Sequence, residues 1–266
     1  MKRLLIVIDG SDNDASSLTS AMLVARGLEA NISVVHPTGL SPSVYNAAEV
    51  AAIRSDVDAA HRTAERAKTA YNEVCARWHG SDWSETLDSE AEIISRLGPY
   101  SDLIVIERLS EEQGPSIVSF NIGLFETGTP VLIAPPRAPA RIATRPVIAW
   151  NGSRQAIASV KSALPLLKLS SAVVVLAGES LPAESFSGLE RYLKAHGVEI
   201  SVAHYPSDQL TARGRARSLL KAVADLSGDL LVMGAYGEST MDSIFGLGRA
   251  TQKIVTAAQI PVFLQQ

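Results

Sequence analysis

Short apolar runs recur along the chain, and each stops at a turn or at a polar residue. Most contain three or more consecutive apolar residues, many of them branched, which is typical of strands buried on both faces of a parallel sheet. A weaker strand is predicted at 83–86. The runs are residues 4–8, 32–35, 102–106, 130–134, 146–150, 172–176, 199–204, 230–233 and 261–264.

Stretches with apolar residues at helical spacing separate these runs. Strands that alternate with helices predict right-handed crossovers and a mostly parallel sheet with helices on both faces. The expected helices are 15–28, 45–78, 90–97, 115–126, 155–167, 187–196, 211–226 and 249–258.

The order of elements restarts at Pro146, so the chain contains two copies of one unit. Asn151-Gly-Ser153 takes the place of Asp9-Gly-Ser11, and the strand after Asp229 matches the strand after Asp102. Prolines between 135 and 139 are typical of a linker. The expected fold is α/β, with two tandem five-stranded mostly parallel sheets in domains 1–140 and 141–266.

The predicted helix 45–78 is unusually long, rich in alanine and free of proline and glycine. Two interpretations remain open: a solvated amphipathic helix that lies across the first domain, or a helix that binds a partner.

Composition narrows the classes of function. Of the 266 residues, 46% are hydrophobic and 20% are charged, a composition typical of a globular protein. The formal net charge is −4, so the chain has no excess of basic residues that would indicate nucleic-acid binding. One cysteine allows no intrachain disulfide, and the five histidines lack metal-ligand spacing. No run approaches the roughly 20 residues of a membrane span. We expect a soluble, cytoplasmic protein without metal, membrane or nucleic-acid partners.

A glycine-rich segment follows the strand 230–233. Gly234 and Gly237 come first, and Gly246 and Gly248 lie just before the helix predicted from Arg249. A loop of this kind, between a buried strand and a helix N-terminus, can bind a phosphate through backbone N–H groups.

The corresponding segment of the first half is shorter and acidic. From Asp102 to Pro130 there are 28 positions, against 32 from Asp229 to Pro261. The first half has Glu107, Glu111 and Glu112 where the second has glycines. Carboxylates without glycine amides repel a phosphate, so we expect an anion site only in the second half.

These motifs resemble those of the universal stress proteins in their tandem, two-domain form. The resemblance rests on Val7-Ile-Asp-Gly-Ser11, on Gly234-Ala-Tyr-Gly237 with Ser239, and on Pro261-Val262, and it covers essentially the whole chain. It implies a Rossmann-like fold of the adenine nucleotide alpha-hydrolase type and binding of ATP or AMP where the loop is intact, with Mg²⁺ only alongside the nucleotide. It also implies pairing of domains through their final strands, with a homodimer as a further option.

Carried onto this sequence, the resemblance places nucleotide contacts at the ends of strands one, two and four of the second half. The expected site residues are Trp150, Asn151, Gly152, Ser153, Ala177, Met233, Gly234, Gly237, Gly248, Arg249 and Ala250.

Three departures from the family pattern concern this site. Ten residues separate Gly237 from Gly248 instead of nine, Arg249 replaces a serine or threonine, and Asn151 replaces an aspartate. Arg249 can pair with phosphate, or reach solvent or nearby carboxylates. Asn151 can bond a base or ribose, or cap the helix.

The motifs are consistent with three alternative functions. No catalytic residue is assigned. The leading hypothesis is a stress-response protein that binds ATP or AMP as a regulatory ligand, with at most slow hydrolysis. Ser239 has no histidine near it in the motif, so a helix cap is favoured over a nucleophile. The alternatives are a nucleotide-independent interaction module that acts through dimerisation, and an ATP pyrophosphatase. The latter lacks its Ser-Gly-Gly-x-Asp-Ser loop, and no Gly-Lys-Ser/Thr of a P-loop kinase occurs.

Overall fold

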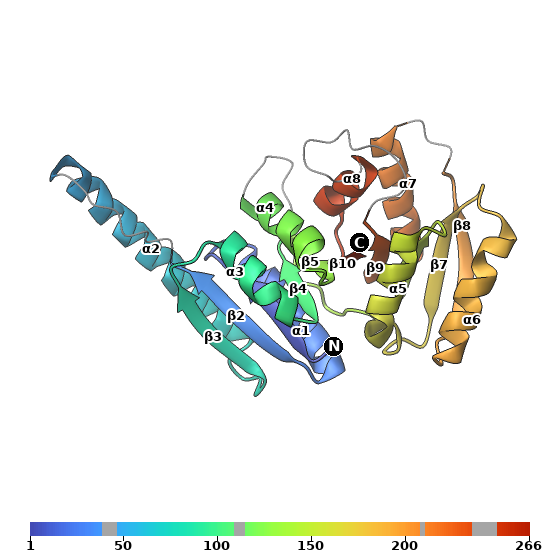
Figure 1. Cartoon of the computed structure of the whole chain (residues 1–266), viewed down its shortest axis with the longest axis horizontal. Coiled ribbons are helices and arrows are strands. Elements are labelled where there is room, and N and C mark those ends of the chain that lie inside the picture. The colour runs from blue at the N-terminus through green and yellow to red at the C-terminus, as the bar shows by residue number, and fades with distance from the viewer. Residues whose placement is uncertain (39–46, 109–114, 208–210, 236–248) are drawn as a thin grey trace.

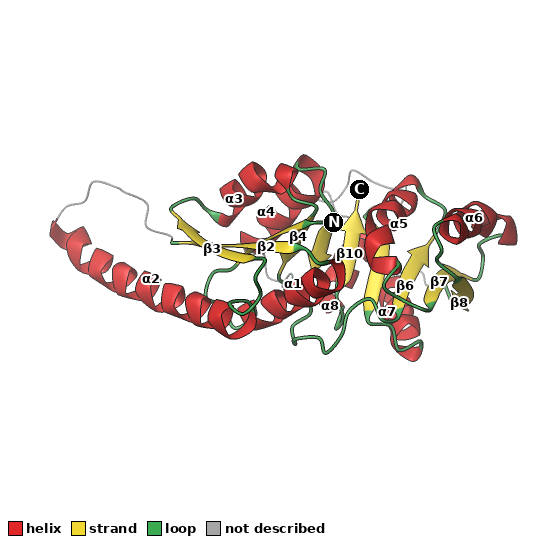
Figure 2. Cartoon of the chain, turned by 90° about the horizontal axis from the view of Figure 1, so that it is seen from below, coloured by secondary structure: helices red, strands yellow, loops and turns green. Residues whose placement is uncertain are grey.

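The computed structural model describes residues 1–38, 47–108, 115–207, 211–235 and 249–266. One ten-stranded sheet runs through the molecule, with helices on both faces (Figures 1 and 2). The expected α/β class and mostly parallel pairing are confirmed.

The first half contributes the strand order β3-β2-β1-β4-β5. All of its strand pairs are parallel. Its elements are β1 (Arg3–Val7), α1 (Asp14–Leu28), β2 (Asn31–Pro37), α2 (Ala47–Val74), β3 (Ser81–Thr86), α3 (Glu90–Leu97), η1 (Gly98–Tyr100), β4 (Leu103–Ile106), α4 (Pro115–Asn121), the π-helical turn η2 (Ile122–Glu126) and β5 (Val131–Ile133).

The second half repeats this order as β8-β7-β6-β9-β10, again with parallel pairs. Its elements are β6 (Pro146–Trp150), α5 (Arg154–Leu167), β7 (Val173–Gly178), η3 (Ala183–Phe186), α6 (Ser187–Ala195), β8 (Ile200–Tyr205), α7 (Ala212–Asp225), β9 (Leu230–Gly234), α8 (Arg249–Ala257) and β10 (Val262–Gln265).

The two halves meet at one antiparallel strand pair. β5 lies beside β10, with Val131 opposite Leu264 and Ile133 opposite Val262. The two five-stranded sheets predicted from the sequence are therefore continuous with each other. The final strand of each half is used inside the chain, which leaves β3 and β8 at the outer edges.

Matching aspartates fasten the first strand of each half. Asp102 accepts hydrogen bonds from the backbone N–H groups of Lys2 and Arg3, at 2.6 and 3.0 Å. Asp229 accepts from those of Thr144 and Arg145, at 3.1 and 2.8 Å. The sequence correspondence between these two segments therefore has a structural counterpart.

Two main apolar layers cover the faces of the sheet. One layer lies under α1, α2, α5 and α6, and the other under α3, α4, α7 and α8; a small third cluster, Leu5, Val35 and Ile93, also packs at α3. Each layer contains residues of both halves; Leu4 and Trp150 share the first, and Phe120 and Leu264 the second. Hydrophobic burial is thus continuous across the β5–β10 junction.

Helix α2 accounts for most of the predicted 45–78 helix, and residues 45 and 46 lie outside the described residues. It packs against α1 and β2. Its first turns extend beyond the strands (Figures 1 and 2). Only its later turns therefore lie along the first half, and whether α2 binds a partner stays open.

Candidate functional site

The carboxyl ends of β6, β7 and β9 lie at one edge of the sheet, because these strands are parallel neighbours. Trp150 pairs with Ala177, and Ala149 with Met233. These expected site residues therefore come together where ligands bind in open α/β sheets.

The turn after β6 is exposed. The Asn151 side-chain oxygen accepts a hydrogen bond from the Ser153 N–H at 3.1 Å, and the Ser153 hydroxyl accepts from the Ala156 N–H at 3.2 Å. The N-cap of α5 is thus Ser153, and Asn151 shapes the turn before it. This leaves the Asn151 amide nitrogen with no hydrogen-bond partner among the described residues.

Gly152 occupies the same turn with a φ of +74°, and no atom of the described residues lies within 4 Å of the position that a Cβ would take. Within the described part of the chain, no other element covers this turn.

The side chains of two expected contact residues are buried in the protein. Trp150 is 6% exposed, and its indole N–H donates to the Ser185 carbonyl at 3.2 Å. Ala177 is fully buried. Neither side chain faces solvent, so a ligand here would reach only their backbone.

The end of β9 is packed tightly against α5. A Cβ on Gly234 would lie 2.6 Å from the Ala156 nitrogen. The buried Ser159 hydroxyl donates to the Met233 carbonyl at 2.7 Å and accepts from the Gln265 N–H at 3.0 Å. Close packing alone therefore requires glycine at Gly234, whatever the loop binds.

Only two of the remaining expected site residues, Arg249 and Ala250, lie within the described part of the chain. Gly237, Ser239, Gly246 and Gly248 lie outside the described residues. Arg249 is the first residue of α8, as the sequence predicts, and Ala250 is half-buried.

The same edge of the first half is covered. Gly10 has a φ of +84°, but a Cβ there would lie 2.3 Å from the Thr63 carbonyl oxygen of α2. Helix α2 therefore lies directly on the turn that matches the turn at Gly152.

An acidic cavity of about 20 Å³ lies under this covered turn. We call it the acidic cavity; its lining is Val7, Ile8, Asp9, Asp14, Ser17, Glu90 and Glu107. Asp14 accepts from the Gly10 N–H at 2.8 Å, and Glu107 accepts from the Ser11 hydroxyl and the Asn13 amide at 3.3 and 3.2 Å. Four carboxyl groups thus meet where the second half has its expected anion site.

Two of these carboxyl groups have raised pKa values. Burial, with the nearby negative charge of Asp9, raises the pKa of Asp14 to about 7. Burial also raises the pKa of Glu90 to about 7, with smaller contributions from Glu107, Asp9 and Asp14. The negative potential makes the first half unsuited to a phosphate.

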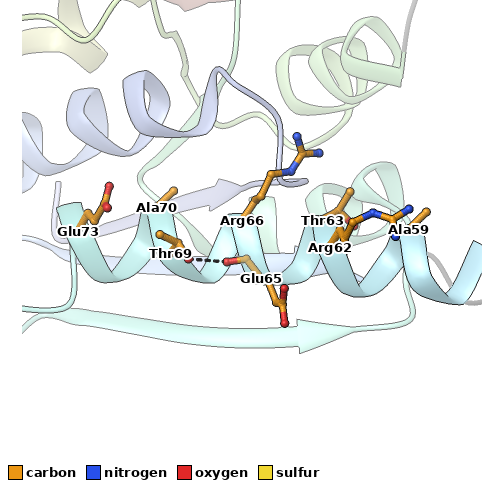
Figure 3. A pocket seen from close by; sticks show the side chains of 8 residues that line it. All are labelled: Ala59, Arg62, Thr63, Glu65, Arg66, Thr69, Ala70 and Glu73. Carbon is orange, nitrogen blue, oxygen red and sulfur yellow. Dashed lines mark hydrogen bonds between the residues drawn. The ribbon is translucent and has the colours of Figure 1, made fainter.

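A larger hollow of about 760 Å³ opens along α2 (Figure 3). Both acidic and basic side chains line it, and the described lining residues all come from this helix: Ala59, Arg62, Thr63, Glu65, Arg66, Thr69, Ala70 and Glu73. None of the expected site residues lies there.

Sequence reasoning singled out Glu107 and Asp9 but missed Asp14, Ser17 and Glu90. A usable signal exists: Asp14 and Glu90 are the first residues of α1 and α3, and both helices begin just after the carboxyl end of a strand. Acidic residues at helix starts usually complement the helix dipole, so the pattern alone gave no reason to suspect burial.

Among the described residues, no three histidine, cysteine or acidic side chains are arranged to hold a metal ion. None of the helices in that part of the chain has both the length and the hydropathy of a membrane span.

Comparison with known proteins identifies the fold. No family model matches the sequence, and no curated protein matches it either. A universal stress protein from Archaeoglobus fulgidus DSM 4304 has a TM-score of 0.70 at 14% identity, covering 99% of this chain and 96% of that one. A functionally unknown protein from Pseudomonas aeruginosa PAO1 has a TM-score of 0.60 at 11% identity, covering 100% and 92%.

The chain therefore has the fold of a universal stress protein over its whole length. A universal stress protein in complex with cAMP covers 51% of this chain and 98% of its own, with a TM-score of 0.33 at 16% identity. That likeness is too low for its ligand to be assigned to this chain.

Proposed function

We propose that this chain is a cytoplasmic universal stress protein of the tandem type, with domains 1–140 and 141–266, that binds ATP or AMP in the second domain. The nucleotide acts as a regulatory ligand, with little or no hydrolysis. The main support is the contrast between two matching turns: no described residue covers Gly152, whereas Gly10 is covered by the Thr63 carbonyl of α2.

The second-half edge suits a nucleotide in three respects. The Asn151 amide nitrogen is available to a base or ribose, Gly152 allows close approach of the ligand, and α8 begins at Arg249 after the glycine-rich segment. A helix N-terminus favours phosphate, and a guanidinium there can bond it in bidentate fashion. Arg249 and the amides of Gly237 and Gly248 would hold the phosphates, together with any Mg²⁺ that accompanies them.

Hydrolysis is expected to be slow because the expected site contains no general base. Its residues are glycine, alanine, serine, asparagine, methionine, tryptophan and arginine. Phosphoryl transfer needs a group that orients the attacking water, and none of these in the described part is placed to do so.

Calorimetric titration of the purified protein with ATP, AMP and inorganic phosphate tests the proposal, together with extraction of any nucleotide that copurifies. Arg249→Ala should weaken ATP binding by roughly 10- to 100-fold, the size of a lost charge-assisted hydrogen bond. Asn151→Ala should weaken both nucleotides and leave phosphate binding unchanged.

Arg191→Ala is the matched control, since it removes an exposed arginine of α6 whose one hydrogen bond to a described residue is to the Ser187 carbonyl of the same helix. Millimolar ATP that produces neither heat nor a thermal shift would refute nucleotide binding. That result would favour an interaction module of the same fold, whose free strand edges are β3 and β8.

A further inference from the structure

The acidic cavity of the first half contains a buried polar atom without a partner. The Ser17 side chain lines the cavity and is 3% exposed, and its hydroxyl has no hydrogen-bond partner among the described residues. Buried hydroxyl groups are nearly always bonded, so this one indicates an occupant that can exchange hydrogen bonds.

The size and geometry of the cavity restrict that occupant. About 20 Å³ is room for a single water-sized species. The described acidic, histidine and cysteine side chains are not arranged to hold a metal ion. A water molecule with a proton shared among the carboxyl groups satisfies both restrictions.

The cavity is connected to α2 through one turn. The Gly10 N–H donates to Asp14, a cavity carboxyl, at 2.8 Å. The other face of Gly10 lies against the Thr63 carbonyl of α2. A change in charge at Asp14 therefore acts on the turn on which α2 is seated.

We propose that the acidic cavity is a proton-binding switch: protonation of Asp14 and Glu90 holds the β1–α1 turn and α2 closed over the first half, and deprotonation loosens them. Charge repulsion supplies the force. Once both side chains are ionised, four carboxylates surround a cavity of water size, and separating the elements that bear them relieves the repulsion.

The charged groups that face the cavity come from four segments. Asp9 follows β1, Asp14 begins α1, Glu90 begins α3, and Glu107 follows β4. On α2, Arg62 precedes Thr63 and Arg66 follows one helical turn later; both line the hollow along α2. The charged groups that raise the pKa values of Asp14 and Glu90 are carboxylates, which adds to the effect of burial.

The pH range over which the switch responds follows from the direction of the two pKa shifts. Each pKa is about 7 in the closed state, above its usual value near 4. Closure is therefore strongest below about pH 4 and weakens as the pH rises, until both groups are ionised above about pH 8.

Hydrogen exchange measured by mass spectrometry between pH 5 and pH 8 tests the switch, after correction for the intrinsic pH dependence of exchange. Opening of peptides from residues 58–74 should increase by up to about tenfold per pH unit between pH 5 and 7 for each coupled proton, then level off. Carboxyl ¹³C NMR should show Asp14 and Glu90 titrating near pH 7.

Asp14→Asn keeps an acceptor for the Gly10 N–H without the charge, so the pH dependence of α2 opening should fall to the part that Glu90 carries, at most about tenfold per pH unit. Glu90→Gln provides the same test from α3 if the first variant fails to fold. Asp225→Asn, which removes an exposed carboxylate on α7, should keep the wild-type profile.

Two results would overturn the switch. One is titration of both Asp14 and Glu90 below pH 5. The other is exchange in α2 that does not depend on pH while the two groups titrate near 7.

Discussion

Gly10 and Gly152 occupy matching turns and share a left-handed backbone, with φ values of +84° and +74°. They differ in what lies above them. Thr63 of α2 covers Gly10, whereas no described residue lies above Gly152. A single contact between a helix and a turn thus distinguishes the two matching turns within the described part of the chain.

Replacing each glycine with alanine measures this difference. Gly152→Ala should cost about 1–2 kcal/mol, the strain of a left-handed alanine. Gly10→Ala should cost at least about 2 kcal/mol more, because its Cβ would lie 2.3 Å from a backbone oxygen that cannot move alone. Urea denaturation of both variants provides the comparison; equal losses would mean that α2 does not rest on this turn.

Two aspartates of the first half should respond to pH with opposite signs. The pKa of Asp14 is raised to about 7, so its ionisation destabilises the fold as the pH rises from about 4 to 7. Asp14→Asn should therefore increase the free energy of unfolding at pH 8 by up to about 4 kcal/mol and change it little at pH 4.

Asp102 is the counterpart. The backbone N–H groups of Lys2 and Arg3 lower its pKa, so its contribution is present above the unfolded pKa and is lost as the pH falls through the lower folded value. Asp102→Asn should destabilise by about 1 kcal/mol at pH 7, a small amount because the side chain is exposed, and by less at pH 3. Denaturation curves at three pH values would show whether the signs are opposite.

Among the elements, α5 is held to the ends of β9 and β10 by one buried serine side chain. Ser159 is fully buried and bonds the Met233 carbonyl and the Gln265 N–H. It thereby joins α5 to β9 and β10 beside the expected nucleotide site. The Ser153 cap sets where α5 begins. The position of the Gly152 turn depends on both serines.

Ser159→Ala should reduce the free energy of unfolding by about 1–3 kcal/mol, because a buried carbonyl and a backbone N–H each lose a partner. Ser187→Ala is the control, since that exposed hydroxyl bonds only the Glu184 carbonyl within the same local turn. A loss for Ser159→Ala no greater than the control would show that water replaces the hydroxyl there.

The ten strands belong to one sheet, and the apolar layers on both faces continue from one half to the other. Phe263 is fully buried on β10 and pairs with Leu132 of β5 at the junction. Because burial is continuous there, the two halves should unfold together although each has its own set of strands and helices.

Denaturation by urea should therefore show one transition, with an m-value suited to the whole chain. Phe263→Ala should lower the free energy of unfolding by about 3–5 kcal/mol and reduce the stability of both halves. Fluorescence reports on each half in variants that keep only the tryptophans of that half, Trp78 and Trp83 in the first or Trp150 in the second. Separate midpoints for the two halves would contradict a shared core.

Much of the fold could be predicted from the sequence because its physical causes are local. Buried runs such as Leu103–Ile106 have a strand pattern independent of their neighbours. Repetition of Asp102 at Asp229, and of Asp9-Gly-Ser11 at Asn151-Gly-Ser153, indicated two copies of one unit. The acidic segment after Asp102 placed negative charge in the first half before any contact was known.

The long-range arrangement came from the tertiary structure. The sequence around Thr63 does not indicate that the Thr63 carbonyl lies on Gly10. Likewise, the positions of Asp14 and Glu90 at the starts of helices do not indicate that both carboxyl groups are buried in one cavity. The sequence pattern predicts ligand contacts at Trp150 and Gly234, but packing against Ser185 and Ala156 also explains these two residues. Local patterns determine the elements and their order; which groups meet depends on contacts between residues far apart in the chain.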